Sequence, residues 1–206
     1  MSKGGPGPLT SVVDPFVRLV RSLTQSKVRF VVIGLSGINL YARSASDLFA
    51  TQDRDLFLPS DPDNTLAAWQ ACEARGLQLL CAGEPLDRPR DRLLAERVLA
   101  NRAIVRATDG SGLDVDLTPV MAGFDFETVW SDRRVFRVEN VEIPVARLSH
   151  LVRSKRRAGR DKNRLFFAAH GDAVRDLIDA ERRSDRDERT PRRKSQRPSA
   201  KPRPRR

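Results

Sequence analysis

Cysteine and histidine are scarce in this sequence of 206 residues. The two cysteines, Cys72 and Cys81, show neither a CxxC motif nor a Cys/His spacing, which excludes a disulfide framework and a structural zinc site. The two histidines, His150 and His170, have no acidic or cysteine partner at ligand spacing, and we interpret them as surface or packing residues. This cysteine usage predicts a reducing compartment.

Long apolar runs are also missing. No stretch approaches the roughly 20 apolar residues that a membrane-spanning helix needs. The first residues, MSKGGPGP, lack the apolar core of a signal peptide. We therefore expect a cytoplasmic protein with no membrane partner.

Basic residues exceed acidic ones, with a formal net charge of +11, and most of the excess lies in residues 181–206. This stretch holds twelve Lys and Arg, four Asp and Glu, and one apolar residue, an alanine. It cannot bury enough apolar surface to offset its ordering entropy, so we predict a disordered basic tail. The tail is either an electrostatic arm for RNA or a solubilising segment. Residues 1–10 are predicted to be a flexible leader, and 11–180 a single folded domain.

Apolar periodicity and turn residues indicate an α/β (α+β) domain, in which a mixed β-sheet is flanked by helices and followed by C-terminal helices. Helices are predicted over 15–27, 36–41, 64–75, 93–100, 124–130, 147–157 and 160–180. Strands are predicted over 28–33, 53–58, 77–81, 103–108, 113–117, 134–138 and 141–145. The sequence Asp-Gly-Ser-Gly at 109–112 is typical of a hairpin turn.

Two aspartates one residue apart, Asp53 and Asp55, begin one of the predicted strands. Alternate side chains of a strand share a face, so these carboxylates point the same way and repel each other unless a cation lies between them. Hard oxygen ligands at this spacing suit Mg²⁺ better than Zn²⁺. The strand over 113–117 carries a second pair, Asp114 and Asp116, which can equally be the polar face of an exposed hairpin.

Nucleotidyl transfer requires cations that neutralise a polyphosphate and a rigid site that aligns the reacting oxygens. Carboxylates from adjacent strands can supply the metal ligands, and Asp116 can also accept the proton of the incoming hydroxyl. The turn at Gly34 and Ser36 precedes a helix and is suited to phosphate, through backbone N–H groups and the serine hydroxyl. Lys155 lies in a basic segment, where it either reaches a phosphate or belongs to a solvated helix face.

Several of these segments resemble the small bacterial branch of the DNA polymerase β-like nucleotidyltransferase superfamily, which includes the toxins of toxin–antitoxin systems. The similarity covers roughly residues 28–167. It is carried by the segments at 32–34, 51–55, 113–117 and 148–160, together with Asn39. The resemblance implies a mixed-sheet nucleotidyltransferase fold, an NTP donor, two Mg²⁺ ions held by Asp53, Asp55 and Asp116, and a cognate antitoxin protein as partner.

The sequence thus predicts an enzyme that transfers an NMP from an NTP to a hydroxyl acceptor, and the basic tail favours RNA as that acceptor. One alternative is a protein that keeps this fold and binds nucleic acid or a partner without catalysis. Another is a modifier of small molecules such as antibiotics, which would need an acidic pocket for a cationic substrate. Outside the tail, the chain has only a slight excess of basic residues.

Overall fold

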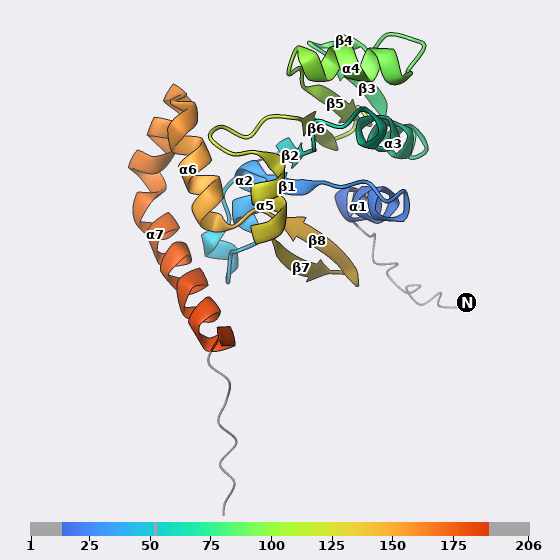
Figure 1. The fold of residues 1–206 in the computed structure, drawn as a ribbon. Coiled ribbons are helices and arrows are strands. Elements are labelled where there is room, and N and C mark those ends of the chain that lie inside the picture. Colours follow the sequence, from blue (N-terminus) through green and yellow to red (C-terminus); the bar gives the residue numbers. More distant parts are fainter. Residues whose placement is uncertain (1–13, 52, 190–206) are drawn as a thin grey trace, which may run out of the picture.

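The computed structural model describes residues 14–51 and 53–189 of the chain (Figure 1). Its helices are α1 (Pro15–Gln25), α2 (Gly34–Asn39), the short 3-10 helix η1 (Ala45–Asp47), α3 (Pro62–Glu73), α4 (Arg92–Ala100), α5 (Phe126–Asp132), α6 (Leu148–Ala158) and α7 (Asp161–Arg189). Its strands are β1 (Val31–Ile33), β2 (Asp53–Phe57), β3 (Gln78–Cys81), β4 (Glu84–Pro85), β5 (Val105–Thr108), β6 (Asp114–Thr118), β7 (Arg134–Val138) and β8 (Val141–Val145).

All of these strands belong to one mixed sheet, in the order β4-β3-β5-β6-β2-β1-β8-β7. The β2–β6 and β1–β8 pairs are parallel, and the other neighbours are antiparallel. The expected α/β architecture with a mixed sheet is confirmed. Both expected hairpins, β5–β6 and β7–β8, are present. The two-residue strand β4 was not anticipated.

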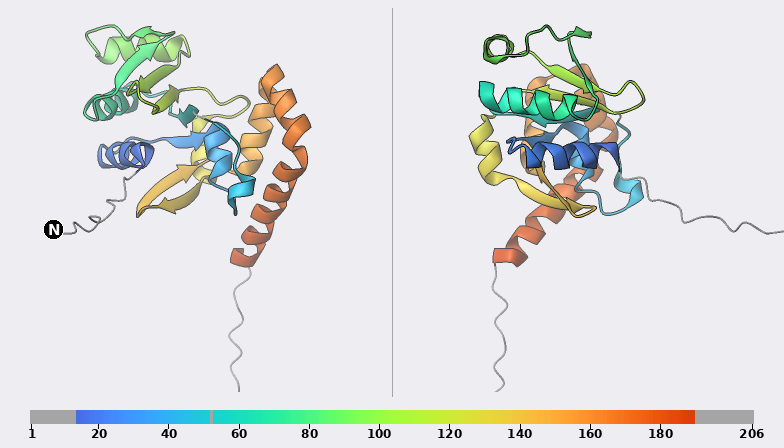
Figure 2. Two further views of the ribbon diagram at one scale, coloured as in Figure 1. Left: turned by 180° about the vertical axis from the view of Figure 1, so that it is seen from behind. Right: turned by 90° about the vertical axis from the view of Figure 1, so that its right-hand side faces the viewer.

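Helices cover both faces of the sheet (Figures 1 and 2). Helices α1, α3 and α4 pack on one face, where Phe30, Trp69 and Leu79 are almost completely buried. Helices α2, α5, α6 and α7 pack on the other face against Val31 and Phe57, and cover the part of the sheet around β1 and β2. Strands β1 and β2 therefore send alternate residues into two separate cores.

Aspartates begin several of the helices. The side chains of Asp14, Asp61, Asp91 and Asp125 each accept a hydrogen bond from a backbone N–H in the first helical turn. Such caps satisfy donors that have no partner within the helix, and each is worth about 1 kcal/mol. Among the described helices, none combines the length and the apolar character required to cross a membrane.

Helix α7 continues to Arg189, whereas the sequence predicted disorder from residue 181. The expectation was wrong for residues 181–189. Glu181 is buried, and its carboxylate accepts a hydrogen bond of 3.4 Å from the backbone N–H of Leu148. Composition marks this stretch as unable to form a core, but it does not reveal charged partners elsewhere in the fold. The remainder of the predicted tail and the predicted leader lie outside the described residues.

The last turns of α7 are held by ion pairs. Asp185 pairs with Arg134 of β7 and with Nη1 of Arg147, the latter at 2.5 Å, and its side chain is only 25% exposed. We expect Asp185→Asn to destabilise the protein by about 1 to 2 kcal/mol, because hydrogen bonds between charged groups that are shielded from water contribute most. Asp179→Asn is the matched control, because Asp179 is 57% exposed and pairs with Arg182 within the helix. Equal thermal unfolding of the two variants would contradict this assignment.

Candidate active site

Four carboxylates form a block on one face of the sheet, where β2 and β6 run side by side. In the parallel register Asp53 lies opposite Asp114, and Asp55 lies opposite Asp116. The alternation predicted for β2 holds, since Arg54 is on the other face, with its guanidinium 5.2 Å from the ring centre of Phe16. Strand pairing thus brings together acidic residues that are about 60 positions apart in the sequence.

A cleft of about 870 Å³ opens over this block. Strands β2, β5 and β6 form one wall, and α6 with the start of α7 forms the other. Asp53, Asp55 and Asp116 lie on the first wall, and Lys155 lies on the second. Gly34 also lines the cleft, so five of the six residues selected from the sequence meet in one cavity. Its volume is in the range of small-molecule and cofactor sites.

The sixth residue, Ser36, and the alternative carboxylate, Asp114, lie differently. Ser36 is not part of the lining, and its hydroxyl donates a hydrogen bond of 3.1 Å to the carbonyl of Ile33. Asp114 shares a face with Asp116 but does not line the cleft either, and its side chain is 38% exposed against 16% for Asp116. Asp116 is therefore the third carboxylate of the cavity, a choice that the sequence pattern left open.

Gly34 has a role that the sequence did not suggest. It adopts a left-handed backbone with φ of 69°, and a Cβ atom built there would lie 2.0 Å from Oδ2 of Asp55. Because Gly34 has no side chain, the Asp55 carboxylate can lie directly against the backbone at the end of β1. Nearby, the amide of Asn39 exchanges two hydrogen bonds with the backbone of Phe49, which ties the 42–50 segment to α2.

Negative charge accumulates at Asp55. Burial raises the pKa of this carboxyl above its ordinary value, and the charges of Asp116 and Asp53 raise it further. Lys155 and Lys162 act in the opposite direction, but their effect is smaller. The site therefore favours an additional cation next to Asp55.

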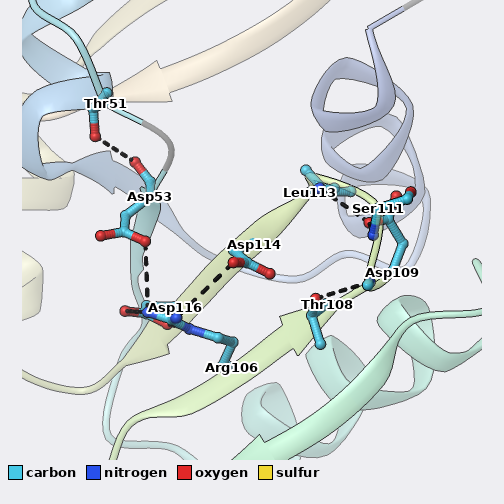
Figure 3. Close-up of polar contacts among 10 residues, drawn as sticks. Thr51, Asp53, Arg106, Thr108, Asp109, Ser111, Leu113, Asp114 and Asp116 are labelled. Carbon is cyan, nitrogen blue, oxygen red and sulfur yellow. Dashed lines mark hydrogen bonds and ion pairs between the residues drawn. The ribbon is translucent and has the colours of Figure 1, made fainter.

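Arg106 of β5 is the cation in closest contact with the acidic block (Figure 3). Its guanidinium donates to both oxygens of Asp116, from Nε at 2.7 Å and from Nη2 at 3.0 Å. The same group lies 3.6 Å from Oδ1 of Asp53 and 4.0 Å from Oδ2 of Asp114. The hydrogen bonds with Asp116 are the main cause of the raised pKa of Arg106, which stays charged.

Lys155 projects from α6 on the opposite wall. Its ammonium lies 3.4 Å from Oδ1 of Asn163 and 5.4 Å from the ring centre of Phe166. Asn163 also donates a hydrogen bond of 2.9 Å to the carbonyl of Lys155, so that α7 fixes this lysine in position. Burial lowers the pKa of Lys155, while the charge of Asp55 raises it. Lys155 and Asp55 are therefore electrostatically coupled across the cleft.

Other residues of the cleft were missed by sequence reasoning. They are Arg102, Arg106, Arg160, Lys162 and His170. A partial signal existed for Arg106, because the predicted turn at 109–112 brings its strand alongside the strand of Asp116. The observed register pairs Arg106 with Asp116, one position away from the pairing that this turn predicts. The others reach the cleft through the packing of α7 and the loop before β5, which local patterns do not reveal.

Neither the protein-family models nor the curated proteins with which the chain was compared give a match. Among the described residues, no group of three or more His, Cys, Asp or Glu side chains is placed so that it could hold a metal ion. What the cleft can do chemically is therefore inferred from its own side chains.

Proposed function

We propose that this protein is a Mg²⁺-dependent nucleotidyltransferase that transfers an NMP from an NTP to a hydroxyl acceptor. The observation that carries the proposal is the convergence of Asp53, Asp55 and Asp116 on one wall of a cleft, with Lys155 on the opposite wall. Two neighbouring strands fix the carboxylates, and a helix supplies the cation. Rigid carboxylates and a facing cation are what phosphoryl transfer requires of a protein.

The chemistry of the donor set, rather than a ready-made arrangement of its side chains, suits a divalent cation. Carboxylate oxygens are the preferred protein ligands of Mg²⁺, and the raised pKa of Asp55 reflects negative charge that a cation would offset. Asp53, Asp55 and Asp116 would hold the metal ions that the family resemblance implies. When bound, these ions would neutralise the polyphosphate and polarise its oxygens.

The chain's own groups have separate tasks in this proposal. Asp116, which is the least exposed of the acidic residues in contact with Arg106, accepts the proton of the acceptor hydroxyl. Lys155 binds a phosphate oxygen as a point charge, and its contacts with Asn163 and Phe166 hold it in position.

We further propose RNA as the acceptor. Arg102, Arg160 and Lys162 are exposed side chains that line the cleft, so a polyanion would meet positive charge next to the carboxylates. Residues 181–206 add a large excess of Lys and Arg to the same chain. Contacts between such residues and phosphates give sequence-independent affinity that decreases with salt.

The direct test is incubation of the protein with each α-labelled NTP, Mg²⁺ and total RNA. Label is expected to enter RNA with at least one NTP, and the signal should disappear with EDTA or with Asp53→Asn. Label on the protein itself, and none on RNA, would support a nucleotidyltransferase but contradict RNA as its acceptor. Full transfer activity in EDTA would contradict the metal requirement, and no transfer to any acceptor would contradict the enzyme.

A second candidate function is a non-catalytic nucleic-acid-binding protein with this fold. The observation in its favour is the bidentate pair between Arg106 and Asp116, since a protein cation already neutralises one of the three carboxylates. This candidate predicts RNA binding that is insensitive to Mg²⁺ and no incorporation of label.

Lys155→Met is expected to raise the KM for the NTP about tenfold, because it removes one charged contact with a phosphate but retains the apolar contact with Phe166. Arg156→Met is the matched control, because Arg156 is exposed, packs over Phe167 and does not line the cleft. Steady-state kinetics at varied NTP concentration distinguish the two variants. An unchanged KM in Lys155→Met would remove this lysine from the nucleotide site.

A further inference from the structure

Arg106 combines three properties that a merely structural ion pair does not need. Its guanidinium contacts Asp53, Asp114 and Asp116 at once, it lines the cleft, and its side chain remains 40% exposed (Figure 3). It lies beside the acidic block, since β5 pairs Arg106 directly with Asp116, and its guanidinium reaches across β6 to within 3.6 Å of Asp53 on β2.

The guanidinium uses the same oxygens that a metal ion would need. Both oxygens of Asp116 accept hydrogen bonds from Arg106, and Oδ1 of Asp53 lies 3.6 Å from Nη2. Asp55 lies opposite Asp116 in the β2–β6 register, and among the described residues the ion pairs of Arg106 are with Asp53, Asp114 and Asp116 and not with Asp55. Arg106 thus neutralises part of the block and leaves negative charge around Asp55.

We propose that Arg106 is a resident counter-cation that a divalent metal ion displaces from Asp116, and that the displaced guanidinium then binds the triphosphate of the nucleotide. This inference rests on the proposed function of the same cleft. Arg106 is a positioning residue toward the metal ion and a binding residue toward the nucleotide.

Displacement and rebinding are suited to arginine. Its charge does not titrate, so metal and guanidinium compete for Asp116 at every pH at which the carboxylate is ionised. A guanidinium also matches the geometry of phosphate with two parallel hydrogen bonds. A metal ion that binds alone breaks the ion pair between Arg106 and Asp116 and gives Arg106 no new partner. A metal–nucleotide complex breaks the same pair but offers the guanidinium phosphate oxygens as new acceptors. Arg106 therefore couples metal binding to nucleotide binding.

The first experiment measures Mn²⁺ affinity of the full-length protein without nucleotide, by electron paramagnetic resonance of free Mn²⁺. Arg106→Gln is expected to bind Mn²⁺ about tenfold more tightly than the wild type, because charge-assisted hydrogen bonds no longer compete. Arg106→Lys keeps the charge but loses the bidentate geometry, and its affinity is expected to fall between the two. Equal affinity of wild type and Arg106→Gln overturns the proposal.

Arg102→Gln is the matched control for the loss of a positive charge. Arg102 lines the same cleft, and within the described residues the structure gives it no carboxylate partner. Its Mn²⁺ affinity is expected to stay within about twofold of the wild type, because screened charges without contact interact weakly. If Arg106→Gln does not fold, the comparison of wild type with Arg106→Lys decides, and equal Mn²⁺ affinity of those two proteins overturns the proposal.

The second experiment adds a non-hydrolysable NTP analogue to the same titration. The analogue is expected to tighten Mn²⁺ binding by the wild type about tenfold more than binding by Arg106→Gln, because only the wild type gains guanidinium–phosphate contacts. The same enhancement in both proteins overturns the rebinding to phosphate. Asp55→Asn separates this failure from failure of the proposed function. If Asp55→Asn loses the Mn²⁺ binding that the wild type shows, the proposed metal site is supported even when the rebinding of Arg106 to phosphate fails. If none of the proteins binds Mn²⁺, both the proposed function and the role of Arg106 are overturned.

Discussion

Replacing Asp55 with asparagine is expected to lower the rate of nucleotidyl transfer at least about a hundredfold, because a cation that stabilises a phosphoryl transition state is worth several kcal/mol. An amide keeps the size of the side chain and loses the negative charge that attracts the metal. Asp114→Asn is the matched control, since Asp114 lies on the same face and outside the cleft. Its transfer rate is expected to stay near that of the wild type.

The Asp55→Asn variant is also expected to be more stable than the wild type at neutral pH without metal. Burial and the charges of Asp116 and Asp53 raise the pKa of Asp55 in the folded protein. The folded chain therefore binds a proton at higher pH than the unfolded chain, and its stability decreases as the pH rises from about 3.9 toward the folded pKa. At pH 7 the ionised carboxylate destabilises the fold, and asparagine removes this contribution.

Thermal unfolding in EDTA at pH 7 and pH 4 tests this reasoning. The stability gained by Asp55→Asn should be largest at pH 7 and should shrink at pH 4, where the wild-type carboxyl carries more of its proton. A variant that unfolds at lower temperature than the wild type at pH 7 would identify Asp55 as a structural residue. A variant with unchanged transfer activity would remove Asp55 from the reaction.

Gly34→Ala is expected to destabilise the protein by about 3 kcal/mol or more, through left-handed strain and a clash with a packed side chain. The added Cβ would lie 2.0 Å from Oδ2 of Asp55, at a backbone φ of 69°. Either the carboxylate or the α2 backbone must move, so transfer activity is expected to fall as well. Denaturant unfolding and the transfer assay measure the two effects.

Gly76→Ala separates the two causes. Gly76 has a similar φ of 78°, and a Cβ built there meets nothing within 4 Å, so only the backbone cost of about 1 to 2 kcal/mol is expected. In an Asp55→Ala background the carboxylate is absent, and Gly34→Ala should then cost as little as Gly76→Ala. If Gly34→Ala lowers the free energy of unfolding equally with and without Asp55, then contact with that carboxylate is not what requires glycine at position 34.

Local patterns predicted most of the elements because periodicity and turn residues act over short distances. The hairpin β7–β8 occupies the predicted residues 134–138 and 141–145. Helix α7 was predicted to end too early, because its last turns contain almost no apolar residues. Ion pairs of Asp185 with Arg134 and Arg147 hold those turns in place, and such partners are distant in the sequence.

The sequence alone determined that Asp53 and Asp55 share a face, because the two-residue period of a strand requires it. Only the tertiary structure decided that Asp116, and not Asp114, lies in the cleft opposite Asp55, since this depends on the register between β2 and β6. It also decided that Gly34 accommodates a carboxylate and that Arg106 lies among the acidic residues. These features arise from contacts between separate strands, and no local propensity specifies such contacts.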